Sequence, residues 1–359
     1  MGAAILERHV TTHGQHTTGI PATVGELDVE VLAGRDGGSG DAVPVKARGY
    51  WEQVWRRLRR DKLAIAGGVA IIALVFAAFI GAPLAERVLG HGPNDQFADA
   101  VDIDTFVPVG PLTKIDTPEG GSTIFVLGAD SLIGRDMFLR MLYGAQTSLE
   151  VAVLATFFSV MIGVLLGAIA GFYRGWVDTG IARLTEVFMA FPALLFIIAI
   201  SATAGEQLNS ITFGFLAPGV FTLVLVFSLF GWFYPARIIR GQVLSLREKE
   251  FVEAARMTGA SDWRIVRSHL LPHLVGPIVV YSTLIVAANI IGEAGLSFLG
   301  LGIQPPTPSW GNLLSQAPEW YLTQPWLMVW PGLAILLATL SFNLLGDGLR
   351  DAFDPRRTM

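Results

Sequence analysis

Six long apolar runs, separated by polar segments, set the pattern of this 359-residue chain. A helix needs about 20 mostly apolar residues to cross a bilayer, and each run has about that length. Because lipid offers no hydrogen-bonding partners to the backbone, such runs predict helices rather than open strands. The predicted spans are residues 63–85, 148–172, 184–204, 213–234, 273–292 and 327–345. The pattern predicts an all-α integral membrane protein.

The composition agrees with a membrane protein. Hydrophobic residues make up 52% of the chain and charged residues only 15%, whereas soluble domains average about 25% charged residues. There is no cysteine, which excludes disulfides, thiolate metal sites and cysteine nucleophiles. Nothing in the charge pattern indicates nucleic-acid binding.

The basic residues are unevenly distributed among the polar segments. Segment 86–146 holds nine acidic residues and four basic ones, namely Arg87, Lys114, Arg135 and Arg140. The other 21 of the 25 basic residues lie in segments 1–62, 173–183, 236–271 and 350–359. Since Lys and Arg gather on the cytoplasmic side of membrane proteins, segment 86–146 is predicted to be extracytoplasmic and both termini cytoplasmic.

The N-terminal 62 residues divide into a tail and a helix. Residues 1–49 are predicted to form a disordered cytoplasmic tail, because they hold too few apolar residues to offset chain entropy. No metal site is expected there, since His9, His13 and His16 have no cysteine partner. Residues 50–62 carry apolar and Arg residues at helical spacing, which predicts an amphipathic helix on an anionic membrane surface. At the other end, residues 350–359 are predicted to be a short cytoplasmic tail.

Apart from the N-terminal segment, the polar segment 236–271 is the longest one predicted to lie on the cytoplasmic side. Its residues 248–258 favour a helix that Gly259 ends in the left-handed conformation. Ser261 is expected to cap a second helix, with Asp262 near the positive end of the helix dipole. In this second helix Trp263, Val266 and Leu270 are predicted to form one apolar stripe.

Two interpretations of this second helix follow from the residues alone. A short helix with an exposed aromatic side chain can insert into a partner's groove. A basic amphipathic helix can equally lie on the membrane with Trp263 among the headgroups. The spacing of the residues does not decide between them.

Other positions in the spans are weaker candidates. Glu293 is a candidate pore residue because ionisable groups in a membrane are costly, although water access at its Gly-rich end would also explain it. Glu186 is expected to be solvated. Three glycines spaced by four residues, at positions 163, 167 and 171, favour close helix packing, and Pro192 predicts a kink. The chain lacks P-loop, nucleophile-elbow and zinc-protease motifs, so no catalytic residues and no cofactor are expected.

The central polar segment resembles the EAA loop of binding-protein-dependent ABC importers, the cytoplasmic coupling element of their membrane subunits. The resemblance rests on Glu253-Ala254-Ala255, Gly259 and the Leu271-Pro272 pair, and His269 is similar to the peptide-importer branch. It implies that the following residues couple the chain to an ATPase: Glu253, Ala254, Ala255, Gly259, Ser261, Asp262, Trp263 and Val266.

Further segments, in the same order, resemble the C-type permease of dipeptide, oligopeptide and nickel ABC importers. The segments are Leu127–Asp130 with Gly134–Asp136, Leu142–Ala145, Gly171–Tyr173 with Gly175–Asp178, Leu296–Gly302, Pro308–Gly311 and Phe342–Asp351. The sequence departs from this pattern in a longer N-terminal tail, an extended segment 86–146 and one extra residue, identified as Ile133.

The resemblance implies the type I importer permease fold, with six spans and a five-helix core over residues 147–349. It also implies a bacterial inner-membrane location and the following partners: a homologous permease, two cytosolic ATPase subunits, an extracytoplasmic binding protein and membrane lipid. The expected cargo is a dipeptide or oligopeptide, with nickel or another small solute as the alternative. A stand-alone channel or secondary transporter is the alternative from a different class of protein.

Overall fold

The computed structural model describes residues 50–116, 121–131, 133–200, 203 and 216–354. All of these belong to one unit, Gly49–Met359. The predicted tail 1–49, with its three histidines, lies outside the described residues. So do the end of the predicted span 184–204 and the start of the predicted span 213–234.

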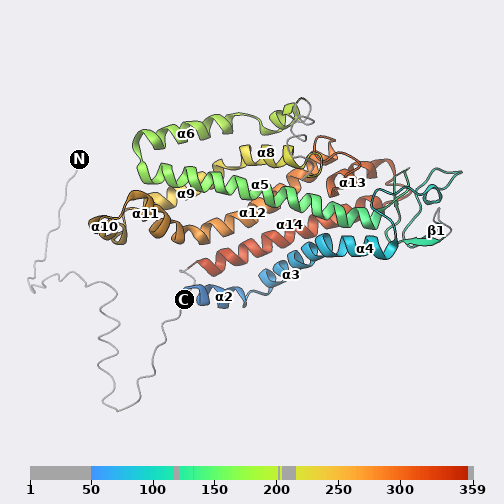
Figure 1. The fold of residues 1–359 in the computed structure, drawn as a ribbon, viewed down its shortest axis with the longest axis horizontal. Coiled ribbons are helices and arrows are strands. Elements are labelled where there is room, and N and C mark those ends of the chain that lie inside the picture. Colours follow the sequence, from blue (N-terminus) through green and yellow to red (C-terminus); the bar gives the residue numbers. More distant parts are fainter. Residues whose placement is uncertain (1–49, 117–120, 132, 201–202, 204–215, 355–359) are drawn as a thin grey trace, which may run out of the picture. The chain divides into compact units, whose positions relative to one another are not determined.

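The described part of the chain contains five helices long and apolar enough to cross a membrane (Figure 1). A sixth span is present if the bent pair Gly175–Ala190 and Ala193–Ile200 counts as one, with an angle of 75° between its halves. Pro192 lies at this bend, which confirms the predicted kink. The five helices are Lys62–Leu89 (α3, η1 and α4), Met137–Tyr173 (α5), Val220–Leu246 (α8 and α9), Asp262–Phe298 (α11, η3 and α12) and Trp326–Phe353 (α14).

Several of these helices are subdivided or joined by short turns. The first consists of α3 (Lys62–Phe76), a π-turn η1 (Ala77–Gly81) and α4 (Ala82–Leu89), and the third of α8 (Val220–Gly231) and α9 (Phe233–Leu246). The fourth consists of α11 (Asp262–Ile265), a π-turn η3 (Val266–Leu270) and α12 (Leu271–Phe298). The remaining helices are α2 (Tyr50–Leu58), α6 (Gly175–Ala190), α10 (Glu250–Met257), α13 (Trp310–Gln316) and the 3₁₀ turns η2 (Ala98–Ala100) and η4 (Ala317–Glu319).

Helix α5 begins at Met137, well before the predicted span at residue 148. Asp136 caps it by accepting a hydrogen bond from the backbone N–H of Phe138 at 2.8 Å. Arg140, Gln146 and Thr147 interrupt the apolar residues of its first turns, so the apolar run that predicted the span begins only after them. Since α4 also runs on to Leu89, the segment between these helices covers residues 90–136 rather than the predicted 86–146.

The polar segment after α8 is also more helical than predicted. Pro235 was expected to lie beyond the end of a span, but it occupies the first turn of α9, where a missing N–H costs no hydrogen bond. Helix α9 continues to Leu246, and α11 is continuous with α12. Only α10 and its flanking turns, residues 247–261, therefore lie between two long helices, in place of the predicted loop 236–271.

Helix α5 packs along α8, α9 and α12 (Figure 1). Its glycines allow the close approach to α9: a Cβ atom on Gly163 would lie 2.6 Å from the Pro235 Cβ, and one on Gly171 would lie 2.8 Å from the Arg240 carbonyl oxygen. The predicted small-residue face of α5 is therefore confirmed as a helix contact within the chain.

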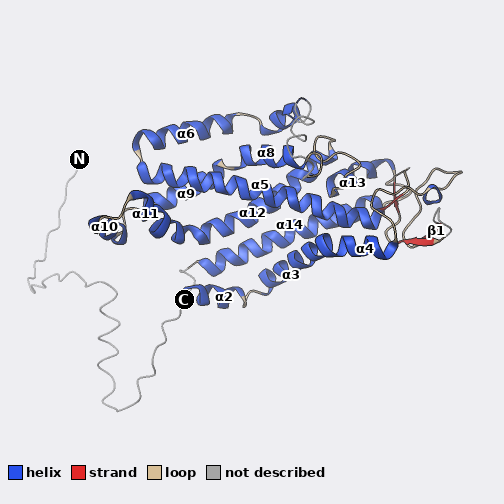
Figure 2. Cartoon of the chain, in the orientation of Figure 1, coloured by secondary structure: helices blue, strands red, loops and turns tan. Residues whose placement is uncertain are grey.

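The segment between α4 and α5 adds two small antiparallel sheets to an otherwise helical fold (Figure 2). The strands are β1 (Thr113–Asp116) with β2 (Ser122–Phe125), and β3 (Ala129–Asp130) with β4 (Arg135–Asp136). Phe97, Ala100, Ile115, Phe125 and Ala129 form their apolar core. Ile133, the extra residue in the resemblance, lies in the turn between β3 and β4. We call this end of the bundle the hairpin end, and the opposite end, which carries α10, the loop end.

The predicted amphipathic helix is present as α2. Its Trp51 and Trp55 are exposed, whereas Val54 is buried. Arg57 donates a hydrogen bond to the backbone oxygen of Asp354 at 2.7 Å, which ties α2 to the end of α14. Asp61 then starts α3 by accepting hydrogen bonds from two backbone N–H groups of its first turn, at 2.9 and 3.1 Å.

Candidate coupling loop and intramembrane polar sites

Helix α10 carries the Glu253-Ala254-Ala255 motif. Its C-terminal end is formed by Gly259, whose φ of +80° is left-handed, as predicted. The N–H groups of Gly259 and Ala260 donate hydrogen bonds to the carbonyl oxygens of Arg256 and Ala255 at 2.9 and 3.0 Å. These bonds satisfy backbone carbonyls that have no partner within the helix itself. The tight reversal brings the chain back directly into α11.

Helix α11 begins after Ser261, in agreement with the predicted position. The Ser261 side chain, however, makes no capping hydrogen bond. The predicted stripe of Trp263, Val266 and Leu270 is wrong, because Ile265 and Leu270 are fully buried while Trp263 is exposed. The reason is the π-turn η3, in which backbone hydrogen bonds span five residues instead of four, so that Leu270 is rotated away from the side of the helix that carries Trp263.

The candidate coupling loop, residues 247–261 with α11, sits on an apolar base. Val252 and Ala255 from α10 and Ile265 from α11 are buried in a cluster with side chains of α5, α9, η3 and α12, namely Ala168, Phe172, Ile239, Val243, Leu270 and Leu274. Apolar burial of this kind stabilises by about 25 cal/mol per Å² removed from water. The loop is thus part of the folded core at the loop end rather than a free surface segment.

The outward side of the same loop is exposed and partly apolar. Met257 is 84% exposed and Trp263 is 64% exposed. Glu253, Ala254, Gly259 and Asp262 are exposed as well, whereas Ala255 is buried and Val266 is partly buried. Of the predicted coupling residues, the structure therefore places most on the accessible side and two in or near the base. We call Met257, Trp263 and the exposed residues between them the loop tip.

Polar contacts fasten the loop to the end of α5. Glu248 forms an ion pair with Arg174, and Arg247 donates a hydrogen bond to the carbonyl oxygen of Phe172. The guanidinium groups of Arg247 and Arg256 lie 5.8 and 5.6 Å from the centre of the Phe172 ring, within the range of cation–π attraction. No pattern in the sequence indicated this role of Phe172, because it depends on α5 and the loop lying side by side.

Glu293 lies near the hairpin end of α12 and is completely buried. Its two carboxylate oxygens accept hydrogen bonds from the hydroxyls of Ser148 and Ser297, each at 2.7 Å. The Ser148 oxygen in turn accepts the backbone N–H of Trp310 at 3.2 Å. Within this chain Glu293 thus joins α5, α12 and α13 instead of facing an open passage. Glu186 is exposed and pairs with Arg183 at 2.7 Å, as expected of a solvated residue.

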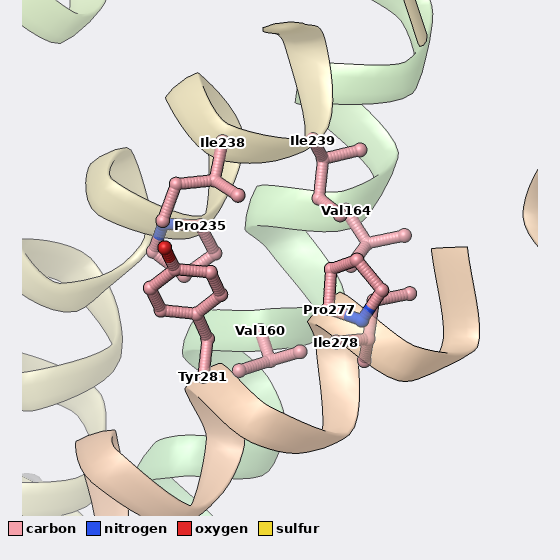
Figure 3. Close-up of a pocket in the computed structure, with 8 residues that line it drawn as sticks. All are labelled: Val160, Val164, Pro235, Ile238, Ile239, Pro277, Ile278 and Tyr281. Atoms are coloured by element: carbon pink, nitrogen blue, oxygen red, sulfur yellow. The ribbon is translucent and has the colours of Figure 1, made fainter. Parts of the chain in front are cut away.

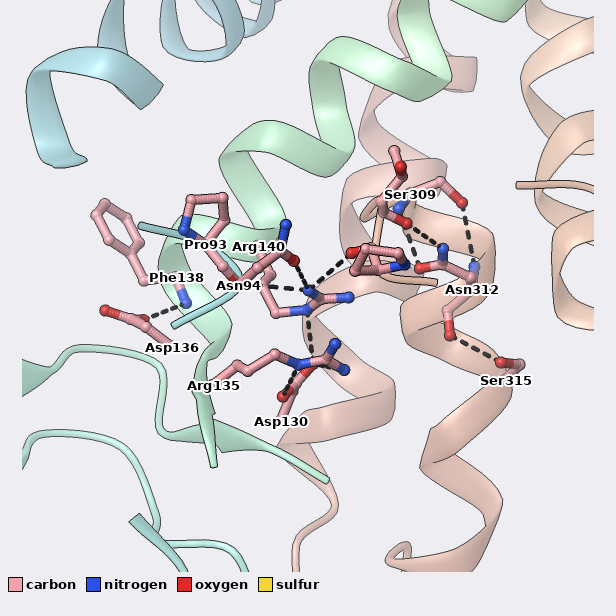
Figure 4. A network of polar contacts seen from close by, with 12 residues as sticks. Pro93, Asn94, Asp130, Arg135, Asp136, Phe138, Arg140, Ser309, Asn312 and Ser315 are labelled. Atoms are coloured by element: carbon pink, nitrogen blue, oxygen red, sulfur yellow. Dashed lines mark hydrogen bonds and ion pairs between the residues drawn. The ribbon is translucent and has the colours of Figure 1, made fainter. Parts of the chain in front are cut away.

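A network of buried charges lies at the hairpin end (Figure 4). Asp130 pairs with Arg135 at 2.9 Å and with Arg140 at 2.6 Å. Arg140 also donates to Asn94 Oδ1 at 2.7 Å and to the carbonyl oxygens of Pro93 and Pro306 at 3.3 and 3.2 Å. These contacts join residues more than 160 positions apart in the chain. Two features of the sequence pointed to this site: Arg140 is a basic residue at the start of an apolar run, and Asp130 and Arg135 lie in segments that resemble the C-type permease.

His91 extends this network to the start of α5. Its Nε2 lies 3.1 Å from Asp136 Oδ2, and its Nδ1 lies 3.1 Å from the Leu89 carbonyl oxygen. Burial lowers the pKa of His91, but the hydrogen bond and charge of Asp136, the Leu89 carbonyl and the charge of Asp95 raise it, and the net direction is upward from 6.5. Both ring nitrogens face acceptors, which favours the protonated ring.

The small apolar cavity between α5, α9 and α12 offers no room for a ligand. It has a volume of about 10 Å³ and lies among Val160, Pro235, Ile239, Pro277 and Tyr281 (Figure 3). That volume is at the lower limit for one water molecule. Among the described residues, no group of three or more His, Cys, Asp or Glu side chains could hold a metal ion.

Comparisons with known proteins identify the class. Residues 163–359 match the family model of the binding-protein-dependent transport system inner membrane component. The chain belongs to this family. Residues 49–105 match the N-terminal transmembrane domain of oligopeptide transport permease C, so within the family it is a C-type permease. It is a multi-pass membrane subunit of a transporter.

Curated relatives agree over nearly their whole length. The chain is 38% identical to the glutathione transport system permease protein GsiD of Pectobacterium atrosepticum over 306 residues, which cover 85% of this chain and 91% of the relative. It is 39% identical to GsiD of Escherichia coli O157:H7, covering 87% and 93%. It is 35% identical to the dipeptide transport system permease protein DppC of Alkalihalophilus pseudofirmus, covering 85% and 90%.

A solved structure confirms the fold. The inward-facing MetNI methionine ABC transporter superimposes with a TM-score of 0.50 at 17% identity, covering 61% of this chain and 98% of the matched chain. At this identity the similarity concerns the fold alone. The expected importer permease fold is therefore confirmed, and the class of stand-alone channels or secondary transporters is disfavoured by the family.

Proposed function

We propose that this chain is the C-type permease subunit of an ATP-driven importer of short peptides, of the size of a dipeptide or glutathione. The support is its identity of 38% and 35% to permeases named for glutathione and dipeptide transport. In this proposal it pairs with a homologous permease, receives its cargo from an extracytoplasmic binding protein, and has both termini in the cytoplasm.

We further propose that the loop tip docks on cytosolic ATPase subunits, two of which serve the permease pair. The observation that carries this proposal is the continuity of one helix. Trp263 in the loop tip and Glu293 at the hairpin end belong to the same helix, Asp262–Phe298. At 1.5 Å per residue the two residues are roughly 45 Å apart. Movement of the tip would therefore shift the far end of the span as a rigid body.

The buried base of the loop supports the same proposal. Because Val252 and Ile265 pack against α5 and α9, a force on the tip reaches three long helices and is not absorbed by a flexible loop. Exposed aromatic and Met side chains are the residue types enriched in partner interfaces. ATP hydrolysis itself is assigned to the partner subunits.

The test uses the complete transporter in proteoliposomes with its binding protein. Glu253→Lys, which reverses a charge on the exposed side of α10, and Gly259→Pro, which is incompatible with a φ of +80°, are expected to abolish ATP-dependent uptake while the chain still inserts. Glu52→Lys is the matched control, because it makes the same charge change on exposed α2 and should leave uptake unchanged.

The cargo is tested in the same vesicles by uptake of labelled dipeptide, glutathione and nickel. Peptide uptake without nickel uptake is the expected result, whereas uptake of nickel alone would replace peptide by the alternative cargo. Normal ATP-dependent uptake by both loop variants would refute the coupling role. Flux that needs no ATPase subunit would place the protein in the channel or secondary-transporter class.

A further inference from the structure

A second cavity lies at the loop end, between α5, α6 and α9. Its volume is about 220 Å³. Its walls are small and apolar along Gly167, Ala170 and Ala182, and charged groups line it from Glu186, Arg237 and Arg240. Pockets that enclose drug-sized ligands measure about 300–1,000 Å³, so this cavity fits one polar headgroup rather than a whole peptide.

The charged groups of the cavity do not balance. Arg240 pairs with Asp178 on α6, and Glu186 pairs with Arg183 at 2.7 Å. No acidic partner is found for Arg237 among the residues that the structure describes, and its side chain is exposed. The cavity therefore carries one uncompensated positive charge, which favours an anionic ligand.

The position of the cavity matches the level of lipid headgroups. Along α6 the charged residues end at Glu186, and the following residues up to Ile200 carry no charge. In the helix Val220–Leu246 no charged residue precedes Arg237. On both helices the change from charged to apolar residues therefore lies at the cavity. Such a change marks the level at which headgroups give way to acyl chains in a bilayer.

We propose that this cavity binds the phosphate headgroup of an anionic phospholipid through Arg237, with the lipid's glycerol against the small apolar side chains. Basic pockets between helices suit such headgroups. The lipid would link α6 to α9 beside the Arg240–Asp178 pair, at the base of the coupling loop. Binding of a headgroup here does not depend on which cargo is carried.

Native mass spectrometry of the purified transporter, exchanged into detergent with phosphatidylglycerol or phosphatidylcholine, tests the proposal. Retention of phosphatidylglycerol over phosphatidylcholine is expected, and Arg237→Gln should weaken it about fivefold, the effect of one basic residue near an anionic lipid surface. Arg237→Lys should keep most of the retention. Arg350→Gln, the same change on α14, is the control and should alter nothing.

A second variant keeps the proposal falsifiable if Arg237→Gln fails to fold. Ala182→Leu keeps the charge but fills the cavity, and it should displace phosphatidylglycerol. Equal retention by the wild type and Arg237→Gln, which is also the result if a partner subunit fills the cavity, would overturn the proposal. Binding of inorganic phosphate as tight as that of the lipid would overturn it too, since the site would then recognise a free anion.

Discussion

The two ends of the helix bundle use charged residues in opposite ways. At the hairpin end, Asp130, Arg135 and Arg140 are buried and form ion pairs with one another. At the loop end, the Arg174–Glu248 pair is 45% and 64% exposed in its side chains, and the largest apolar side chains of the loop tip face outward. One end has its polar groups directed inward, and the other presents an accessible surface.

The difference shows what each end can do. Removing one partner from a buried ion pair is costly because an unpaired charge remains in a medium of low dielectric constant. An exposed pair contributes little, since water solvates each group separately. The hairpin end is therefore built to hold α4, α5 and the segment before α13 in one fixed arrangement. The loop end obtains its rigidity from apolar burial beneath the tip, which leaves the tip itself available to a partner.

The largest effect is expected from breaking the buried network. Asp130→Ala leaves Arg135 and Arg140 without their carboxylate and should destabilise the chain by about 3–5 kcal/mol, measured as loss of thermal stability in detergent. Glu248→Ala removes the acidic member of the exposed pair at the loop end and should cost less than about 1 kcal/mol. Equal losses in the two variants would contradict the contrast between the two ends.

A smaller effect, on binding rather than stability, is expected at the loop tip. Trp263→Ala should weaken the association with the ATPase subunits by about 2 kcal/mol, or roughly 30-fold, as for a central aromatic residue of an interface. The melting temperature should hardly change, because Trp263 is already exposed. Trp55→Ala on α2, where the tryptophan is 58% exposed, is the matched control for measurement by surface plasmon resonance. A loss of affinity in both variants would mean that the tip is not the specific contact.

The smallest effect is a pH dependence at the hairpin end. Folding raises the pKa of His91 above its ordinary value of 6.5. The stabilisation that His91 contributes is therefore complete below pH 6.5 and is lost as the pH rises through the pKa that His91 has in the folded chain. Melting temperatures of the wild type should therefore fall across this range more than those of His91→Gln. The same slope in both proteins would assign the pH dependence to other groups.

The candidate site was only partly readable from the sequence. The motif around Glu253 and the left-handed turn at Gly259 depend on local chemistry, so the sequence located both. Trp263 and Ile265 are two residues apart and lie on opposite sides of any helix, but which side is buried depends on packing against α5 and α9. The position of Leu270 depends on the π-turn η3, which no period of 3.6 predicts. Arg140 and Phe172 could not be assigned partners, because their contacts lie far away along the chain.

The sequence by itself determined the class of fold, because crossing a membrane imposes long apolar runs and a backbone that satisfies its own hydrogen bonds. It also determined the kink at Pro192 and the close packing at the α5 glycines, which follow from the covalent structure of single residues. Only the tertiary structure decided where the helices extend beyond the predicted spans, as at Met137 and Leu246, because those turns are stabilised by packing against distant segments. It also decided that Glu293 is buried between three helices and that one helix runs from the loop tip to that carboxylate, since both depend on how separate helices meet in space.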